Sequence, residues 1–157
     1  EVLTICERQL EDKPMQVDEN LHKNGAKVAT TSPDANIRST PAMLRDRGIS
    51  ALVVSTATNP VSGILSERDI VSAFAARESI ILTESVDTIM TPPVVSCAPE
   101  ELLTDAMATT TTTRFRHMPV VEAGKLVGIL SIGDLVKHHL YELEQETSSL
   151  RAYIATA

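Results

Sequence analysis

Two serine–aspartate pairs carry the chemistry that this sequence offers. Ser66 stands three positions before Asp69, and Ser131 stands three positions before Asp134. At a helix start such a pair forms a capping box, in which each side chain accepts from the other residue's backbone N–H. The same groups can hold a ligand, because a serine hydroxyl donates to phosphate, an aspartate accepts from ribose hydroxyls and a helix start favours anions. The pairs are therefore either helix caps alone or caps that also bind a nucleotide.

Both pairs lie inside a repeated stretch. Gly-Ile-Leu-Ser-Glu-Arg-Asp-Ile-Val (63–71) returns 65 positions later as Gly-Ile-Leu-Ser-Ile-Gly-Asp-Leu-Val (128–136). Two copies of one unit therefore make up most of the chain, each in the order strand–helix–strand–strand–helix. Ile49 aligns with Phe115 at an offset of 66, so the first copy has one extra turn residue. A unit of this size closes its own core poorly, and we expect the two sheets to pack together.

Composition excludes several classes of protein. With 43% apolar residues among 157, the chain can bury a core, which has to be aliphatic because aromatic residues are few. A net charge of −7 argues against nucleic-acid binding. No apolar run is long enough to span a membrane, and no signal peptide is visible. Cys6 and Cys97 form no motif, which favours a reducing cytoplasm.

The elements that position the pairs follow from periodicity and turn signals. We expect a helix at 1–11, a loop at 12–25, strands at 27–31, 49–55, 61–65 and 94–97, a hairpin of 117–122 with 125–130, and helices at 66–77 and 131–154. Ile70, Val71 and Phe74 should point inward from the first of these long helices. Pro41 either kinks the preceding helix or restarts it as a first helical residue, and we favour the restart. The helix opened by Pro99 should fray at Thr109–Thr113.

The motifs together resemble a tandem pair of cystathionine β-synthase (CBS) domains, the Bateman module, of the free-standing bacterial type. They are Gly-Ile-Ser-Ala-Leu-Val-Val (48–54), Gly-Ile-Leu-Ser-Glu-Arg-Asp (63–69), Ile-Met-Thr-Pro-Pro-Val-Val (89–95), Arg-Phe-Arg-His-Met-Pro-Val-Val (114–121) and Gly-Ile-Leu-Ser-Ile-Gly-Asp (128–134). The resemblance implies an α/β fold of two β-α-β-β-α motifs packed as a pseudo-twofold pair. It divides the chain into an N-terminal helix and loop (1–25), a first CBS domain (26–83), a second (84–143) and an extension of the last helix (144–157).

The resemblance also implies a ligand and the residues that hold it. Such modules bind adenosine nucleotides such as AMP, ATP or NAD in clefts between the repeats, and they dimerise. By analogy, ribose binds Asp69 or Asp134, and phosphate lies near Ser66 or Ser131 and near Arg116 and His117. The adenine pocket is lined by Ile49, Ser50 and Ala51, and Thr91 in the linker touches base or ribose. We prefer the Asp134 site, because Gly133 leaves room there and because Arg116 and His117 lie in the same unit.

These observations favour a regulatory protein over an enzyme. No nucleophile has a base partner at a recognisable spacing, and no metal cluster or P-loop is present in the sequence. The first hypothesis is an adenine-nucleotide sensor that needs no cofactor and acts on an unidentified regulated protein. The second is a structural dimerisation module without ligand, and the third, a redox or metal regulator, has little support. An apolar stripe of Val136, Leu140, Leu143, Leu150 and Ile154 predicts a homodimer through the last helix.

Overall fold

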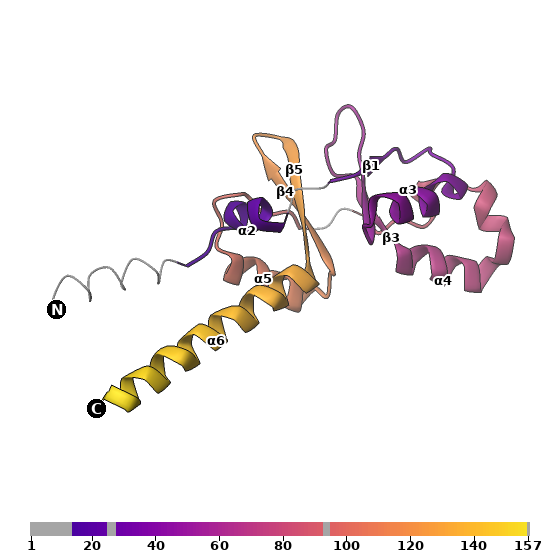
Figure 1. Ribbon diagram of the computed structural model, residues 1–157. Coiled ribbons are helices and arrows are strands. Elements are labelled where there is room, and N and C mark those ends of the chain that lie inside the picture. The colour runs from indigo at the N-terminus through magenta and orange to yellow at the C-terminus, as the bar shows by residue number, and fades with distance from the viewer. Residues whose placement is uncertain (1–13, 25–27, 93–94, 157) are drawn as a thin grey trace.

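The chain folds into two similar units, from the second of which a long helix extends (Figure 1). The computed structural model describes residues 14–24, 28–92 and 95–156, so the helix predicted for 1–11 lies outside the described residues. The helices and strands are α2 (Val17–Asn24), β1 (Thr30–Thr31), α3 (Thr40–Arg47), β2 (Ala51–Val54), β3 (Gly63–Ser66), α4 (Glu67–Arg77), α5 (Leu103–Thr113), β4 (His117–Glu122), β5 (Lys125–Ser131) and α6 (Ile132–Thr156). Short 3₁₀ turns occupy Ile37–Ser39, Glu78–Thr83 and Val86–Thr88. This is the predicted α/β tandem fold.

The first repeat is built on a three-stranded sheet. β1 runs parallel to β2, and β2 runs antiparallel to β3 with Ala51 opposite Ser66 and Val54 opposite Gly63. All four residues of β2 are buried, as a short run of β-branched and aliphatic residues predicts. The register places the Ser66–Asp69 pair directly beside the start of β2.

The second repeat is built on a hairpin. β4 pairs antiparallel with β5, with His117 opposite Ser131, and the turn lies at Ala123 and Gly124 as predicted. Residue 94 of the strand predicted for 94–97 lies outside the described residues, and the rest forms one parallel bridge, between Cys97 and Val120. The Cys97 N–H donates to the carbonyl of Pro119 at 3.0 Å, so this segment takes the place that β1 has in the first repeat.

The helix around Pro41 restarts, as favoured from the sequence. A 3₁₀ turn ends at Ser39, and α3 begins at Thr40 with Ser39 as N-cap and the proline in its first turn. Proline fits this position because its missing N–H has no partner in the helix there. α3 ends at Gly48, whose φ of 61° is left-handed.

The threonine run does not fray, and that prediction was wrong. α5 continues through Thr113, and the five hydroxyls of Thr109–Thr113 each donate to a backbone carbonyl three or four residues earlier, at 2.7–3.0 Å. These bonds satisfy each hydroxyl within the helix, and burial of Thr110, which is 1% exposed, anchors the run. Tertiary packing therefore overrides a poor helix propensity.

The loop predicted for 12–25 is also wrong in part, because Val17–Asn24 forms α2. Val17 and Leu21 are buried, and they join a cluster from the second repeat: Cys97, Leu103, Ala106, Met118, Val120, Leu130 and Leu135. The Val17 N–H donates to the Glu101 carbonyl at 2.9 Å. The sequence prediction failed because this helix is held by distant partners and is too short to be stable alone.

The apolar core is divided between the repeats. Ile37, Val54, Leu65 and Ile81 of the first repeat form one buried cluster with Val86, so the segment after α4 closes the core of the first repeat. Ile70 packs inward from α4 as predicted, but Val71 is 67% exposed and Phe74 is 49% exposed, which corrects the prediction for both residues. α4 therefore buries a narrow face and leaves an apolar one uncovered.

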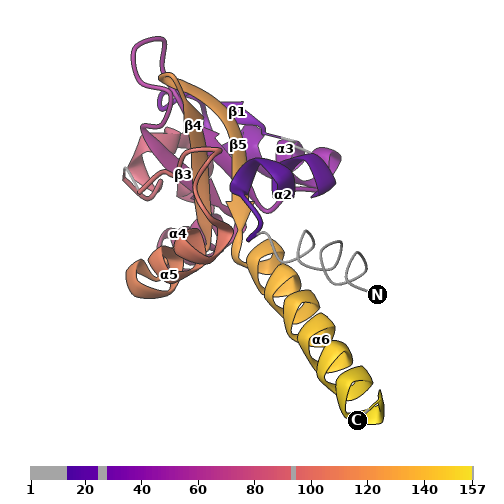
Figure 2. The same cartoon turned by 90° about the vertical axis from the view of Figure 1, so that its left-hand side faces the viewer.

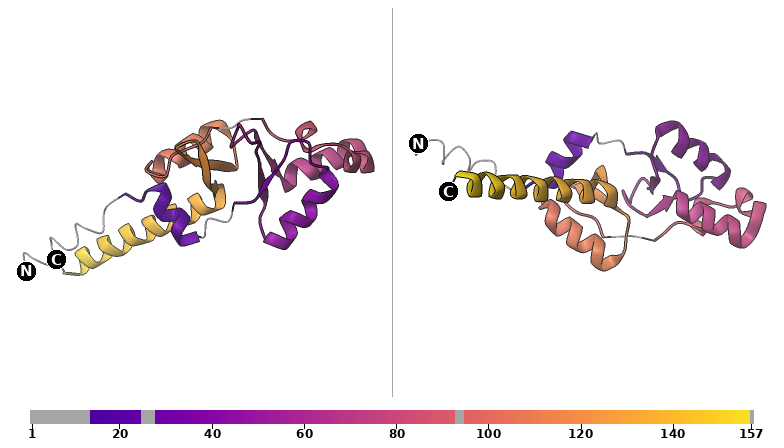
Figure 3. Two further views of the ribbon diagram at one scale, coloured as in Figure 1. Left: turned by 90° about the horizontal axis from the view of Figure 1, so that it is seen from above. Right: turned by 60° about the horizontal axis from the view of Figure 1, so that its bottom comes forward.

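The two sheets lie beside each other, with α4 and α5 on one side and α2 and α3 on another (Figure 2). α6 leaves this body as a single straight rod (Figure 3). Among the described helices none combines the length and the hydropathy needed to cross a bilayer.

Candidate functional site

Both serine–aspartate pairs form complete capping boxes. At the start of α4 the Ser66 N–H and hydroxyl donate to Asp69 Oδ2 at 2.8 and 2.6 Å, and the Asp69 N–H donates back to the hydroxyl at 3.3 Å. At the start of α6 the corresponding distances between Ser131 and Asp134 are 3.2, 2.6 and 3.2 Å. One oxygen of each carboxylate thus serves the cap. Because a carboxylate offers about four acceptor positions, each aspartate can also accept from ligand hydroxyls.

Each helix start is also tied to the start of a strand in its own repeat. The Glu67 N–H donates to the carbonyl of Ser50 at 3.1 Å, and the Ile132 N–H donates to the carbonyl of Arg116 at 2.9 Å. Several N–H groups that a helix start could offer to a phosphate are therefore engaged within the chain. A phosphate bound here has to rely largely on side chains.

The first cleft is centred on Asp69. It has a volume of about 150 Å³ and is lined by Ile64, Ser66, Arg68, Asp69, Thr91, Arg114, Phe115, Arg116 and His117. Thr91 is held here by two backbone bonds with Ile64, of 3.0 and 2.9 Å. This approach requires Gly63, since a Cβ there would lie 2.5 Å from the Thr91 carbonyl oxygen.

The second cleft is centred on Asp134. It has a volume of about 360 Å³ and is lined by Asn20, Leu21, Arg47, Gly48, Ile49, Ser50, Ala51, His117, Ile129, Ser131 and Asp134. Its α2 wall approaches β5 closely at Gly128, where a Cβ would lie 2.6 Å from a methyl carbon of Leu21. α2 thus forms one wall of the Asp134 cleft, as the segment at Thr91 forms one wall of the Asp69 cleft.

The clefts are crossed between the repeats. Asp69 of the first repeat faces residues 114–117 of the second, whereas Asp134 of the second repeat faces residues 47–51 of the first. All ten residues singled out from the sequence line one cleft or the other. The preference for Asp134 assumed that Arg116 shares its site, and this is corrected by the structure: Arg116 lines the Asp69 cleft. Two residues of the same repeat therefore need not line the same cleft, because each cleft combines the aspartate of one repeat with a strand start of the other.

His117 lines both clefts. Its Nε2 lies 3.0 Å from the hydroxyl oxygen of Ser50, which joins the start of β4 to the segment before β2. Burial lowers the pKa of His117, and the nearby charges of Asp69, Arg116, Asp134 and Glu67 act on it in both directions. The imidazole is therefore neutral at neutral pH, and it borders both clefts.

Several lining residues were not anticipated from the sequence. They are Ile64, Arg68, Arg114 and Phe115 in the Asp69 cleft, and Asn20, Leu21, Arg47, Gly48 and Ile129 in the Asp134 cleft. The alignment of Ile49 with Phe115 could have found Phe115 and its neighbours, because a pseudo-twofold axis repeats every contact. No signal in the sequence pointed to α2.

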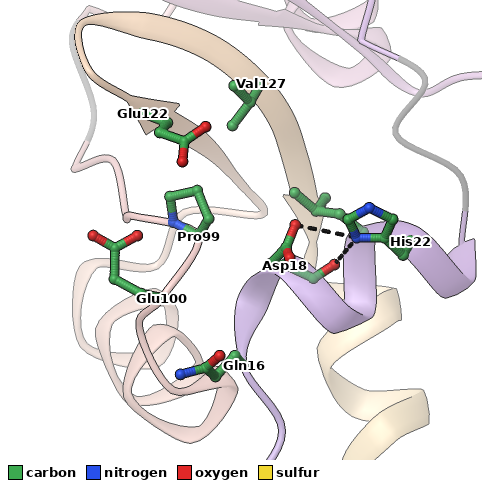
Figure 4. Close-up of a pocket in the computed structure, with 8 residues that line it drawn as sticks. Gln16, Asp18, His22, Pro99, Glu100, Glu122 and Val127 are labelled. Carbon is green, nitrogen blue, oxygen red and sulfur yellow. Dashed lines mark hydrogen bonds and ion pairs between the residues drawn. The ribbon is translucent and has the colours of Figure 1, made fainter.

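A larger hollow of about 560 Å³ lies between α2 and the second repeat (Figure 4), and it shares Leu21 with the lining of the Asp134 cleft. Asp18, Glu100 and Glu122 line it, and His22 Nδ1 is engaged with Asp18 at 2.8 Å from its carbonyl and 3.1 Å from its carboxylate. A phosphate would meet three carboxylates there, so this hollow is unsuited to a nucleotide despite its size.

Comparison with known proteins agrees with this arrangement. The family model of the CBS domain matches residues 25–76 and 86–141. An uncharacterized 17.7 kDa protein of Acidianus ambivalens is 34% identical over 112 residues, which are 71% of this chain and 66% of that relative, just under two thirds of its length.

Solved structures show the same fold. A CBS-domain-containing protein from Agrobacterium tumefaciens has 40% identity and a TM-score of 0.73, over 80% of this chain and 99% of that one. The CBS domain pair of protein MJ0100, solved in complex with 5-methylthioadenosine and S-adenosyl-L-methionine, has 20% identity and a TM-score of 0.71, over 83% and 99% of the two chains. With its internal repeat, its two crossed clefts and these matches, the chain belongs to the CBS domain family and carries two CBS domains in tandem.

Proposed function

We propose that this CBS pair is a regulatory module that binds an adenine nucleotide, such as AMP, ATP or NAD, between its repeats. The observation that carries the proposal is the pair of crossed clefts, each with an aspartate on one side and a strand start of the other repeat opposite. An aspartate accepts two hydrogen bonds from the cis hydroxyls of ribose, and Arg116 and His117 offer donors to phosphate. The adenosine-type ligands of the MJ0100 pair support the same ligand class.

The proposal includes a homodimer through the outer helices. Val71 on α4 and Val136 on α6 occupy the same position of the repeat, and they are 67% and 48% exposed. α6 continues the apolar surface with Leu140, Leu143, Leu150 and Ile154, which are 44–73% exposed. Exposed apolar side chains on one helix favour burial against the same surface of a second copy of the chain.

Regulation follows if the nucleotide changes how two modules, or a module and its regulated protein, sit together. Occupancy can shift that equilibrium only when the two arrangements bind the nucleotide with different affinity. The module itself then needs no catalytic group, and a cytoplasmic location remains a prediction. A ligand-free dimerisation module is the alternative, and the complete capping boxes suit it, because they give both aspartates a structural role.

A thermal-shift panel of AMP, ADP, ATP, NAD and S-adenosylmethionine separates the two functions. A ligand at a hundred times its dissociation constant stabilises the folded chain by about 2.7 kcal/mol. For a chain of this size that corresponds to a rise in Tm of roughly 5–10 °C. GMP serves as the control for adenine recognition. No shift with any compound at millimolar concentration would leave the ligand-free dimer as the function.

A further inference from the structure

The two clefts differ in charge at matched positions of the repeat. The Asp69 cleft is lined by Arg68, Arg114 and Arg116, and the corresponding positions around the Asp134 cleft hold Gly133, Gly48 and Ser50. The Asp134 cleft has Arg47 in its lining, which aligns with Thr113. Three guanidinium groups therefore surround one cleft, and one guanidinium belongs to the other.

Arg114 adopts a backbone conformation that disfavours arginine. Its φ of 59° and ψ of 21° are left-handed and match those of Gly48, which are 61° and 39°. Each residue ends a helix of its repeat, and glycine is the usual residue for that cap. A side chain other than glycine is strained at such a position, and strain of this kind is concentrated at functional sites.

The arginines lie at the mouth of the cleft. Arg68, Arg114 and Arg116 are exposed, whereas Ser66, Asp69, Phe115 and His117 are half-buried. A volume of about 150 Å³ lies below the 300–1,000 Å³ of sites that enclose a small molecule. A nucleotide whose ribose binds Asp69 therefore has to leave part of itself at the mouth, beside the guanidinium groups.

We infer that the Asp69 cleft selects nucleotides by the length of their phosphate chain and takes di- and triphosphates in preference to monophosphates. Arg114, kept in place of glycine at the cost of backbone strain, is the specificity-determining residue. The Asp134 cleft, with fewer cationic groups, lacks this preference. The inference rests on the proposed nucleotide function and adds to it a division of labour between the clefts.

Isothermal titration calorimetry with ATP and AMP, both without magnesium, tests the division. Asp134→Asn weakens binding in the Asp134 cleft and leaves the Asp69 cleft intact. Asp69→Asn weakens binding in the Asp69 cleft and leaves the Asp134 cleft intact. In the Asp134→Asn chain, ATP should bind more tightly than AMP, and adding Arg114→Gly should reduce the ATP-to-AMP affinity ratio about five- to tenfold, as expected for one partly exposed charge-assisted contact. Arg114→Lys should retain most of the ratio. In the Asp69→Asn chain the ratio should be close to one and should not respond to Arg114→Gly.

A second readout separates a binding role from a structural one. Arg114→Gly relieves the left-handed strain, so its Tm should rise by about 2–4 °C while the ratio falls. Arg45→Gln removes the same charge from an exposed position outside both clefts and should change neither quantity. An unchanged ratio in Arg114→Gly, with both nucleotides still binding, overturns the inference alone. Absence of binding by both ATP and AMP to the wild-type chain overturns the inference, and the proposed function falls with it only if ADP, NAD and S-adenosylmethionine also fail to bind.

Discussion

Burial makes the stability of this fold depend on the protonation of His117. Because burial lowers its pKa, the folded chain resists a proton that the unfolded chain accepts below the ordinary histidine value of about 6.5. The free energy of unfolding should therefore fall as the pH drops below that value, and be unaffected by this residue well above it. His117→Ala places at this position the residue that the first repeat has as Ala51, and it should reduce the loss of stability between pH 7.5 and 5.5 in urea denaturation.

His117→Gln is the matched variant, since glutamine keeps a polar partner for the Ser50 hydroxyl but does not titrate in this range. Both variants should show the same shallower dependence on pH. If both retain the wild-type dependence, another group is responsible for the loss, and His117 is not the titrating residue between the clefts.

Ten of the residues that line the two clefts could be predicted from the sequence, but not which of them line the same cleft. The types and spacing of Ser66, Asp69, Ser131 and Asp134 predicted both helix starts, because capping is local physics. Arg116 was assigned to Asp134 since both lie in one repeat, whereas in the folded chain it faces Asp69. Such pairing depends on how two repeats pack across a pseudo-twofold axis, and local spacing contains no information on that.

At the scale of elements, the threonine run of α5 shows helix propensity and packing in opposition. Thr111 and Thr112 are exposed, and their hydroxyls donate to carbonyls of their own helix at 2.9 Å. Replacing either by alanine should raise the free energy of unfolding by about 0.5 kcal/mol, because alanine is the better helix former. Thr110→Ala is the buried control and should lower it by about 1 kcal/mol through lost packing. Urea denaturation that shows the same loss of stability at the exposed and buried positions would contradict this account.

α2 is the element whose packing the sequence did not indicate, and Gly128 tests it. Gly128→Ala places a Cβ 2.6 Å from a Leu21 methyl carbon and should cost about 1–3 kcal/mol of stability. Leu21→Ala should relieve that clash, so the double variant should be hardly less stable than Leu21→Ala alone. Additive losses in urea denaturation would mean that Leu21 does not contact β5 at this glycine.

The elements differ in how well the sequence predicts them. Strands β2 to β5 and the long helix α6 follow from strong apolar patterns, and their predicted bounds agree with the structure within a few residues. α2 has only Val17 and Leu21 as buried apolar anchors, and both meet residues about 80–115 positions away in the second repeat. A helix stabilised by such distant contacts leaves little trace in its own sequence.

At the scale of the whole molecule, α6 determines the proposed assembly. Leu143 is 44% exposed in the single chain, and burying that exposed part in a dimer would contribute roughly 0.7–1.3 kcal/mol from each copy. Leu143→Glu should therefore raise the dimer dissociation constant at least about tenfold in sedimentation equilibrium. Gln145→Glu adds the same charge at an exposed position on another side of α6 and should leave the dimer intact. A wild-type chain that is monomeric at high micromolar concentration would contradict the dimer itself.

In the proposed function the two aspartates hold a nucleotide in addition to capping their helices, and calorimetry of Asp69→Asn and Asp134→Asn separates these two roles. Asparagine can keep the cap, because its side-chain oxygen accepts the bonds that Asp69 and Asp134 accept at 2.6–3.2 Å. Stability should change by only a fraction of a kcal/mol. Nucleotide affinity should fall about ten- to a hundredfold in at least one variant, since a charge-assisted ribose contact is lost. Wild-type affinity in both variants would contradict the claim and leave the aspartates as helix caps alone.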